Sequence, residues 1–234
     1  MTNEKFDSFA IGLMTVMQVS IVVPMVVVWC RKRHFSAAVR RLSLYVYISA
    51  FFVVVMKVLY PAYIPDNYWL LMGFNCSKIV LFGLVYHQVL RSERVRRLVA
   101  IGTGVAVMGI LAVFLADNWL GVSVSRIVQC ALLAAFAIAY LEQTLTTPPV
   151  RSVWQSPMGL LSVGQLLYSA GTVTAFSLEY LTLTIHDQSC RVLVIAVVGM
   201  AFNGFLTLAF LRAKRQPFPV GTPAPVALGQ LMHP

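Results

Sequence analysis

The sequence predicts an all-α fold: a polytopic membrane protein built as a seven-transmembrane-helix bundle. Of its 234 residues, 59% are hydrophobic and only 11% are charged, whereas a soluble domain is roughly 45–50% apolar and about 25% charged. The apolar residues also fall into seven runs of about 20 residues, the length that an α-helix needs to cross the hydrocarbon core. A soluble fold cannot hide this much apolar surface, so lipid is the expected solvent for most of the chain.

Short polar joints separate the seven predicted spans. We expect an extracytoplasmic tail over residues 1–8, the seven-helix domain over 9–212 and a disordered cytoplasmic tail over 213–234, which is rich in proline. The spans are 9–30, 42–64, 68–90, 98–116, 122–146, 158–181 and 190–211. Proline clusters such as Pro148-Pro149 end helices, because proline fixes φ and removes a backbone donor. Residues 1–8 lack the basic region and cleavage site of a signal peptide, so we expect the first span to be retained.

The basic residues predict the orientation of the bundle. Of the 18 Lys and Arg, 13 lie in the joints after the odd-numbered spans and in the C-terminal segment, and three lie on the opposite side. Short cytoplasmic loops retain positive charge, so we expect the N-terminus outside and the C-terminus in the cytoplasm. The net charge of +10 therefore sits in loop clusters, which indicates contact with the lipid bilayer and no nucleic-acid partner.

Nothing in the sequence indicates a catalytic or metal centre. The four cysteines form no CxxC pair, and we expect no disulfide and no cofactor. His87 and Glu142 are predicted near the same depth, where they could act as an acid–base pair or as metal ligands. No HExxH motif, paired aspartate or Ser/His arrangement accompanies them. We therefore predict no catalytic residues and do not expect an enzyme.

The sharpest functional candidate is Lys78, near the middle of the third span. An ionisable residue at this depth is costly and marks a functional site by default. Asn75 lies three residues earlier, on the same helical face. Three arrangements satisfy such an amine: it is uncharged, it is held by carbonyls, amides and water, or it binds an anionic or carbonyl-bearing ligand. The sequence leaves all three open. Lys57, in the outer part of the second span, is expected to snorkel to the interface.

Polar side chains also follow one face of the sixth span and part of the seventh. They either form hydrogen bonds between helices or line a polar cavity between the third, sixth and seventh spans. For the cavity, the predicted ligand-binding residues are Lys78, Asn75, Gln165, Tyr168 and Asn203. The sequence does not decide between these alternatives.

Glycines are spaced along the fourth span. Gly102, Gly104 and Gly109 lie within it. Small residues allow the backbones of neighbouring membrane helices to approach closely. We therefore predict that these glycines together with Ala106, and the alanine-rich fifth span, form closely packed surfaces.

Three passages carry a resemblance to a known group. They are Asp66-Asn67-Tyr68-Trp69, Ser152-Val153-Trp154-Gln155-Ser156, and Asn203 followed by Ala209-Phe210-Leu211-Arg212-Ala213. Their order resembles a largely uncharacterised group of small seven-helix bacterial membrane proteins, common in Bacteroidetes, some of which look like sensor modules of membrane histidine kinases. The resemblance implies a seven-helix fold in the bacterial cytoplasmic (inner) membrane. Those proteins often carry an acidic residue where Lys78 stands here, which implies a different ligand preference.

The predicted function is that of a receptor-like or sensory membrane module, which binds a small or lipidic ligand within the bundle. The C-terminal tail is too short for a kinase or cyclase domain, so we expect signalling through a separate cytoplasmic protein partner. A microbial rhodopsin is disfavoured, because the seventh span has no lysine for a retinal Schiff base. The alternatives are a small-solute transporter or channel subunit and a membrane scaffold or accessory subunit.

Overall fold

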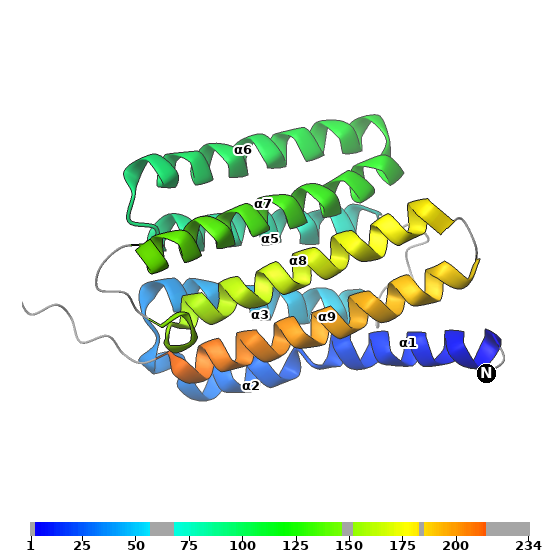
Figure 1. The fold of residues 1–234 in the computed structure, drawn as a ribbon, viewed down its shortest axis with the longest axis horizontal. Helices are drawn as coiled ribbons and strands as arrows, with labels where there is room; N and C mark the ends of the chain where they lie inside the picture. Colours follow the sequence, from blue (N-terminus) through cyan, green and yellow to red (C-terminus); the bar gives the residue numbers. More distant parts are fainter. Residues whose placement is uncertain (1–2, 57–67, 147–151, 183–184, 214–234) are drawn as a thin grey trace, which may run out of the picture.

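The computed structural model describes residues 3–56, 68–146, 152–182 and 185–213, and every regular element among them is helical (Figure 1). The predicted all-α class is therefore confirmed. In chain order the elements are α1 (Asn3–Val19), α2 (Val22–Arg31), the 3₁₀ turn η1 (Lys32–His34), α3 (Ala37–Val54), α5 (Tyr68–Val89), α6 (Glu93–Ala116), α7 (Asn118–Thr146), the 3₁₀ turn η3 (Val153–Gln155), α8 (Pro157–Thr182) and α9 (Ile185–Arg212).

Six stretches of the described chain are long and apolar enough to cross a membrane. They are Phe6–Arg31, Ala37–Val54, Tyr68–Val89, Glu93–Ala116, Leu120–Thr146 and Ser189–Arg212. Helix α8 has 26 residues but is not among them, and buried polar side chains such as Gln165 and Ser169 make it less apolar. Large apolar side chains face outward, for example Leu115 at 69% exposure. These features indicate an integral membrane protein surrounded by lipid.

The helix ends differ from the predicted spans. Helices α6 and α9 begin at Glu93 and Ile185, before the apolar runs start, since a helix can continue into the polar headgroup region. Residues 3–8, predicted as a tail, belong to α1. Helix α3 ends at Val54, and the rest of the predicted second span, Lys57 included, lies outside the described residues, as do residues 214–234 of the predicted tail.

The first span is a broken helix. Pro24 has no N–H, and its ring clashes with the carbonyl of Ser20 in a regular helix, so the chain departs from α geometry between α1 and α2. The amide of Asn203 on α9 donates hydrogen bonds to the Ser20 hydroxyl (2.7 Å) and to the Met17 carbonyl (3.4 Å). A side chain from the last helix therefore satisfies polar groups at the break.

The helices form a ring that is closed in one half of the bundle. In the half that contains α2, neighbouring helices pack in the order α2, α3, α5, α7, α8 and α9, and α9 packs back on α2. Helix α6 lies outside this ring against α5 and α7 (Figure 1). In the other half α1 replaces α2. Helix α1 packs on α9 but is not among the helices that pack along α3, so the described ring is open there.

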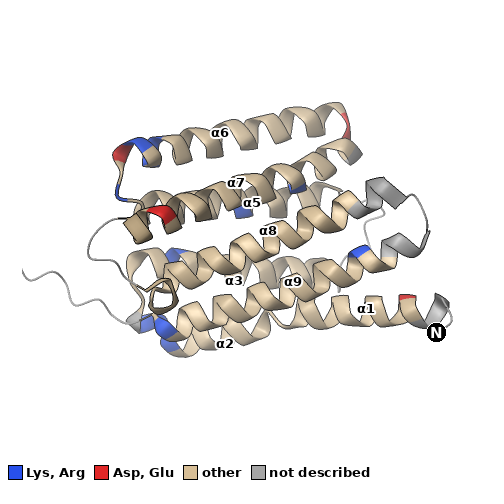
Figure 2. Cartoon of the chain, in the orientation of Figure 1, with Lys and Arg blue, Asp and Glu red and all other residues tan. Residues whose placement is uncertain are grey.

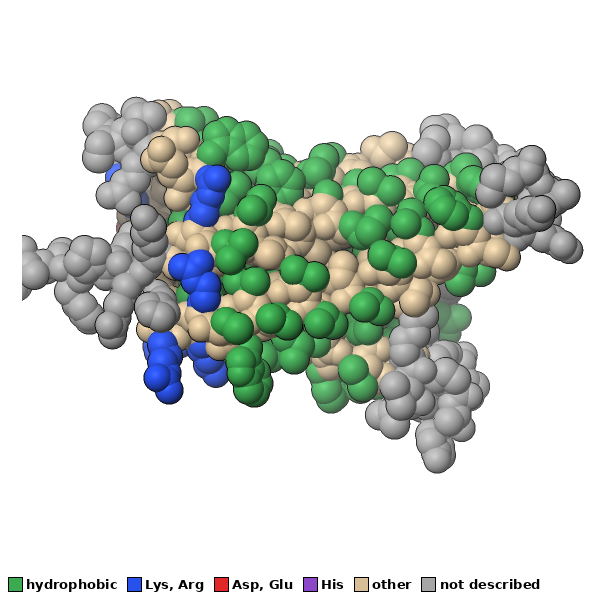
Figure 3. Space-filling view, turned by 90° about the horizontal axis from the view of Figure 1, so that it is seen from below, with side chains coloured by type: hydrophobic (Ala, Val, Ile, Leu, Met, Phe, Trp, Pro, Cys, Tyr) green, Lys and Arg blue, Asp and Glu red, His purple; other side chains and the backbone are tan. Residues whose placement is uncertain are grey.

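Basic side chains gather at one end of the molecule, which we call the basic end. Figures 2 and 3 show Lys and Arg concentrated there, where α2 ends and α3 and α6 begin, and hydrophobic side chains along the middle of the face in Figure 3. The basic end comprises Arg31, Lys32, Arg33, Arg40, Arg41, Arg91, Arg94, Arg96, Arg97 and Arg212. Charge is therefore asymmetric across the apolar belt, as the sequence predicts.

Two glycines of α8 allow a close approach to α9. A Cβ added at Gly164 would lie 2.6 Å from Cβ of Phe205, and one added at Gly171 would overlap the side chain of Val198. Neither contact leaves room for a larger residue. These glycines set the spacing between the two helices that enclose the site described below.

The packing predicted for the fourth span is wrong at two of its three glycines. A Cβ added at Gly104 or Gly109 would meet no other atom within 4 Å, whereas one at Gly102 would make an ordinary contact of 3.5 Å with Leu132. The reason is the position of α6 outside the ring, which leaves one side of this helix for lipid.

Candidate functional site

Lys78 is buried in the centre of the bundle, with an exposed fraction of 3%. Its Nζ lies 4.2 Å from the ring centroid of Tyr168, 5.3 Å from that of Phe202 and 5.6 Å from that of Tyr45. The rings come from α8, α9 and α3, while the lysine comes from α5. An ammonium group over an aromatic face is stabilised by about 0.5–2 kcal/mol, so four helices converge to hold this cation.

The aromatic rings leave the three N–H donors of Lys78 without acceptors. The lysine forms no ion pair or hydrogen bond with any described residue, and the described ion pairs both belong to Glu93 at the basic end. An ammonium group has three donors and no acceptor, and burying a charge without hydrogen bonds is costly. The amine is therefore available to water or to an acceptor on a bound molecule.

A cavity of about 270 Å³ lies beside the lysine, lined by α1, α3, α5, α7, α8 and α9. Four of the five predicted site residues line it: Lys78, Asn75, Tyr168 and Asn203. The cation that faces this cavity without a described ion pair is Lys78, and no Asp or Glu is among the described lining residues. The cavity therefore favours an anion or a strong hydrogen-bond acceptor.

Buried oxygens without partners surround the same cavity. The side-chain oxygens of Gln18 and Gln129 have no hydrogen-bond partner in the described part of the chain, and both residues line the cavity. Buried polar groups are nearly always hydrogen-bonded, and leaving one unsatisfied costs about 1–3 kcal/mol. These groups are therefore available to water or to a polar ligand. Each is a polar residue within an apolar run, which is the signal that could have added them to the predicted site.

Three of the predicted residues also form hydrogen bonds within the bundle. The Asn75 amide donates to the Ser125 hydroxyl (2.7 Å), which links α5 to α7, and Asn203 holds the break described above. Gln165 is fully buried, donates to Ser169 (3.1 Å) and does not line the cavity. The sequence left two roles open for these polar residues, and the structure contains both. Asn75 and Asn203 form hydrogen bonds between helices, whereas Lys78 and Tyr168 line a cavity.

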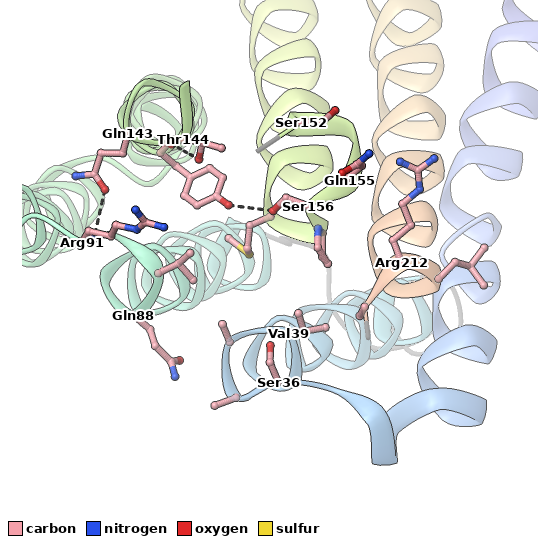
Figure 4. A pocket seen from close by; sticks show the side chains of 18 residues that line it. Ser36, Val39, Gln88, Arg91, Gln143, Thr144, Ser152, Gln155, Ser156 and Arg212 are labelled. Atoms are coloured by element: carbon pink, nitrogen blue, oxygen red, sulfur yellow. Dashed lines mark hydrogen bonds between the residues drawn. The ribbon is translucent and has the colours of Figure 1, made fainter. Parts of the chain in front are cut away.

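A second, wider cleft of about 1120 Å³ opens at the basic end, between the ends of α3, α5, α7, α8 and α9 (Figure 4). Among the described residues that line it, Arg91 and Arg212 are charged and none is acidic. The Arg91 backbone N–H donates to Gln143 (3.0 Å), and its side chain points toward Ser156 in Figure 4. The Arg212 guanidinium donates to the carbonyl of Trp154. The cleft is therefore polar and cationic.

A series of buried aromatic rings separates the two cavities and connects their walls. Phe82 contacts Tyr45 of the lysine cavity (ring centroids 5.2 Å apart) and Tyr86 (6.5 Å). Tyr86 contacts Tyr140, which lines the basic-end cleft (6.3 Å). The Tyr86 hydroxyl is hydrogen-bonded to that of Ser162 (3.0 Å). A shift of the rings around the lysine would therefore reach the cleft through direct contacts.

Comparisons of the chain with models of protein families, with curated proteins and with solved structures find no match. The described residues also hold no group of three or more His, Cys, Asp or Glu that could bind a metal ion. The described chemistry at the centre of the bundle is therefore that of a buried amine, aromatic rings and neutral amide and hydroxyl groups, which suits binding.

Proposed function

We propose that this protein is a receptor-like or sensory integral membrane module, which binds a small or lipidic ligand within its helix bundle and signals through a separate cytoplasmic partner. One observation carries the proposal: the buried amine of Lys78 has no acceptor among the described residues and faces a cavity with further unpaired polar groups. A mostly apolar cavity with a few convergent polar groups is typical of a small-molecule site.

The basic-end cleft supports the signalling part of the proposal. Its described lining has two arginines and no acid, so it favours an acidic surface on a partner. The aromatic series ending at Tyr140 gives a ligand at the lysine a contact route to this cleft. Signalling would consist of two packing arrangements of these rings, one of which the ligand favours.

The proposal includes seven membrane spans in a bacterial cytoplasmic membrane, with the N-terminus outside and the basic end in the cytoplasm. Two native cysteines test this orientation, because Cys30 is exposed at the basic end and Cys190 is exposed near the start of α9. We expect a membrane-impermeant maleimide to label Cys190 and not Cys30 in intact spheroplasts, with Cys30→Ser and Cys190→Ser variants identifying the site. Labelling of Cys30 before lysis would contradict the orientation.

Native mass spectrometry of protein released from gently purified membranes tests the ligand. We expect an adduct of defined mass on the wild type that is missing from Lys78→Met, because the amine supplies the charged contact. Lys32→Met is the matched control, since Lys32 is an exposed lysine that also lies over a ring, 5.9 Å from that of Tyr47. An adduct that survives in Lys78→Met would remove the lysine from the site, and no adduct on any variant would remove the main support for a receptor.

A small-solute transporter is the second candidate, and the broken first helix favours it. Transporters place discontinuous helices at substrate sites near the midplane, and the α1–α2 break lies beside residues of the lysine cavity, namely Gln18 and Ile21. Uptake into proteoliposomes separates the two functions. A receptor shows saturable binding without net uptake, whereas a transporter accumulates the solute that it binds.

A further inference from the structure

We infer that the ligand of the lysine cavity is a single-chain amphiphile with a carboxylate head, such as a long-chain fatty acid, which enters from the bilayer between α1 and α3. This inference rests on the proposed function, since it names the class of molecule that the same cavity receives and the route by which it arrives.

The entry route follows from how the ring of helices is closed. Helices α1 and α3 both contribute to the cavity lining, with Met14 and Met17 from α1 and Val53 from α3, and Met56 lines it just after the end of α3. These two helices do not pack along each other, whereas α2 packs on α3 nearer the basic end. The four lining side chains are only half-buried, so among the described residues this side of the cavity keeps access from outside. We call this opening, between Met14 and Met17 of α1 on one side and Val53 of α3 and the following Met56 on the other, the α1–α3 portal.

The portal opens onto a surface that suits lipid. Val54, next to the portal on α3, is 56% exposed, and Val16 on α1 is 55% exposed. Neither Val16 nor Val54 is a polar residue that would attract a water-soluble ligand to this surface. A molecule already dissolved in the bilayer reaches the portal without crossing water, because apolar chains favour lipid over water by about 0.8 kcal/mol for each CH₂ group.

The carboxylate head follows from the charge at the inner end of the cavity. Lys78 offers three N–H donors, and the described lining residues include no acid that would repel an anion. A charge-assisted hydrogen bond between an ammonium and a carboxylate is about twice as strong as a neutral one, and low dielectric strengthens it further. One amine balances one negative charge. The unpaired Oε1 of Gln129 on the neighbouring wall is an acceptor, so it can take a hydrogen bond from a water beside the carboxylate.

The single chain follows from the size and the walls of the cavity. A volume of about 270 Å³ is just below the roughly 300–1,000 Å³ of pockets for drug-sized ligands, so it cannot hold a phospholipid headgroup with two chains. The portal side chains include three methionines, Met14, Met17 and Met56, whose flexible thioethers adapt to a chain of variable position. The carboxylate and the first part of the chain therefore occupy the cavity, while the rest of the chain stays in lipid.

Binding of radiolabelled oleate to the purified protein in nanodiscs of zwitterionic lipid tests the ligand class. We expect saturable binding that unlabelled oleate displaces, that oleyl alcohol displaces at least tenfold less well, and that acetate does not displace. Lys78→Met should weaken oleate binding at least tenfold, and Lys32→Met should leave it unchanged. Equal displacement by oleate and oleyl alcohol would overturn the carboxylate, and displacement by acetate at concentrations similar to oleate would overturn the amphiphile.

A pair of neighbouring substitutions tests the portal. Val53→Trp fills it, whereas Val54→Trp adds the same bulk on the adjacent, lipid-exposed position of α3. We expect Val53→Trp to reduce oleate binding or its association rate at least tenfold, with no change for Val54→Trp. Met56→Trp is a second blocking variant if Val53→Trp does not give a monodisperse protein. Unchanged binding and association in a folded blocking variant would overturn the portal.

These experiments test the ligand class and the receptor function separately. If oleate does not bind but the wild type carries a Lys78-dependent adduct of another chemistry, the ligand class is wrong and the receptor function stands. If oleate does not bind and no variant carries an adduct, both are wrong.

Discussion

Replacing Lys78 with methionine is expected to stabilise the ligand-free protein. The wild-type ammonium is buried without an acceptor among the described residues, and methionine has a similar length and shape but needs no hydrogen bond. Replacing buried charges by apolar residues of similar volume often stabilises proteins by about 1–4 kcal/mol. The cation–π contacts with the three rings offset part of this gain, at about 0.5–2 kcal/mol. We therefore expect a higher melting temperature for Lys78→Met in ligand-free detergent solution.

Bound ligand should reverse the order of the two melting temperatures, so that the wild type becomes more stable than Lys78→Met. A molecule that binds only the folded wild type raises its stability by RT ln(1 + [L]/Kd), which is about 2.7 kcal/mol at a ligand concentration of 100 Kd. Thermal unfolding with and without oleate measures both effects on the same samples. Lys32→Met, an exposed lysine with one ring contact, should match the wild type in both conditions.

The opposite outcome would identify a structural lysine. If Lys78→Met lowers the melting temperature of the ligand-free protein, then the contacts of the ammonium with Tyr45, Tyr168 and Phe202 hold the four helices together. The site would then be a packing centre, and the proposed receptor would lose the observation that carries it.

Much of the architecture could be predicted from the sequence, because the solvent determines it. Long apolar runs must become helices in lipid, where every backbone polar group needs an internal partner, and the predicted helical class is confirmed. The helix ends were less predictable. Glu93 and Ile185 begin helices in the structure although they precede the apolar runs, since hydropathy measures the apolar core and not the polar turns on either side of it.

The site was only partly predictable, because contacts between helices depend on how they rotate against each other. The depth of Lys78 could be read from its position in an apolar run, but its three aromatic neighbours come from three other helices. For the same reason Gln165, which shares a helical face with Tyr168, lies outside the cavity lining. Asn203 was predicted to line the cavity. In the structure it also forms hydrogen bonds at the helix break, which no residue spacing in the sequence predicts.

Replacing Gly171 with leucine is expected to have the largest effect on folding among these variants. Even a Cβ at this position would overlap Val198, and a leucine adds three more carbon atoms at the same contact. Overpacking costs about 1–3 kcal/mol and occasionally more. Here the overlap lies between two packed helices, so we expect a cost at or above the upper end of that range. The measurements are the yield of monodisperse protein and its melting temperature in detergent.

Gly109→Leu is the matched control for this substitution. Gly109 is also a helical glycine in a predicted span, but a Cβ there would meet nothing within 4 Å, and loss of a helical glycine favours the helix by roughly 0.5–1 kcal/mol. The control should therefore equal or exceed the wild type in stability. Equal stability of Gly171→Leu and Gly109→Leu would mean that α8 and α9 are not in close contact at this point.

The same substitution should also change the site, because the contact it disrupts sets the distance between α8 and α9. Tyr168 lies three residues before Gly171 on α8, and its ring is 5.6 Å from that of Phe202 on α9. Both rings lie over the Lys78 ammonium. Separating the two helices widens this ring contact and removes part of the stabilisation of the cation. If a milder variant such as Gly171→Ala folds, we expect weaker oleate binding than in the wild type, and the ratio of the two affinities reports how far the ligand depends on the spacing of α8 and α9.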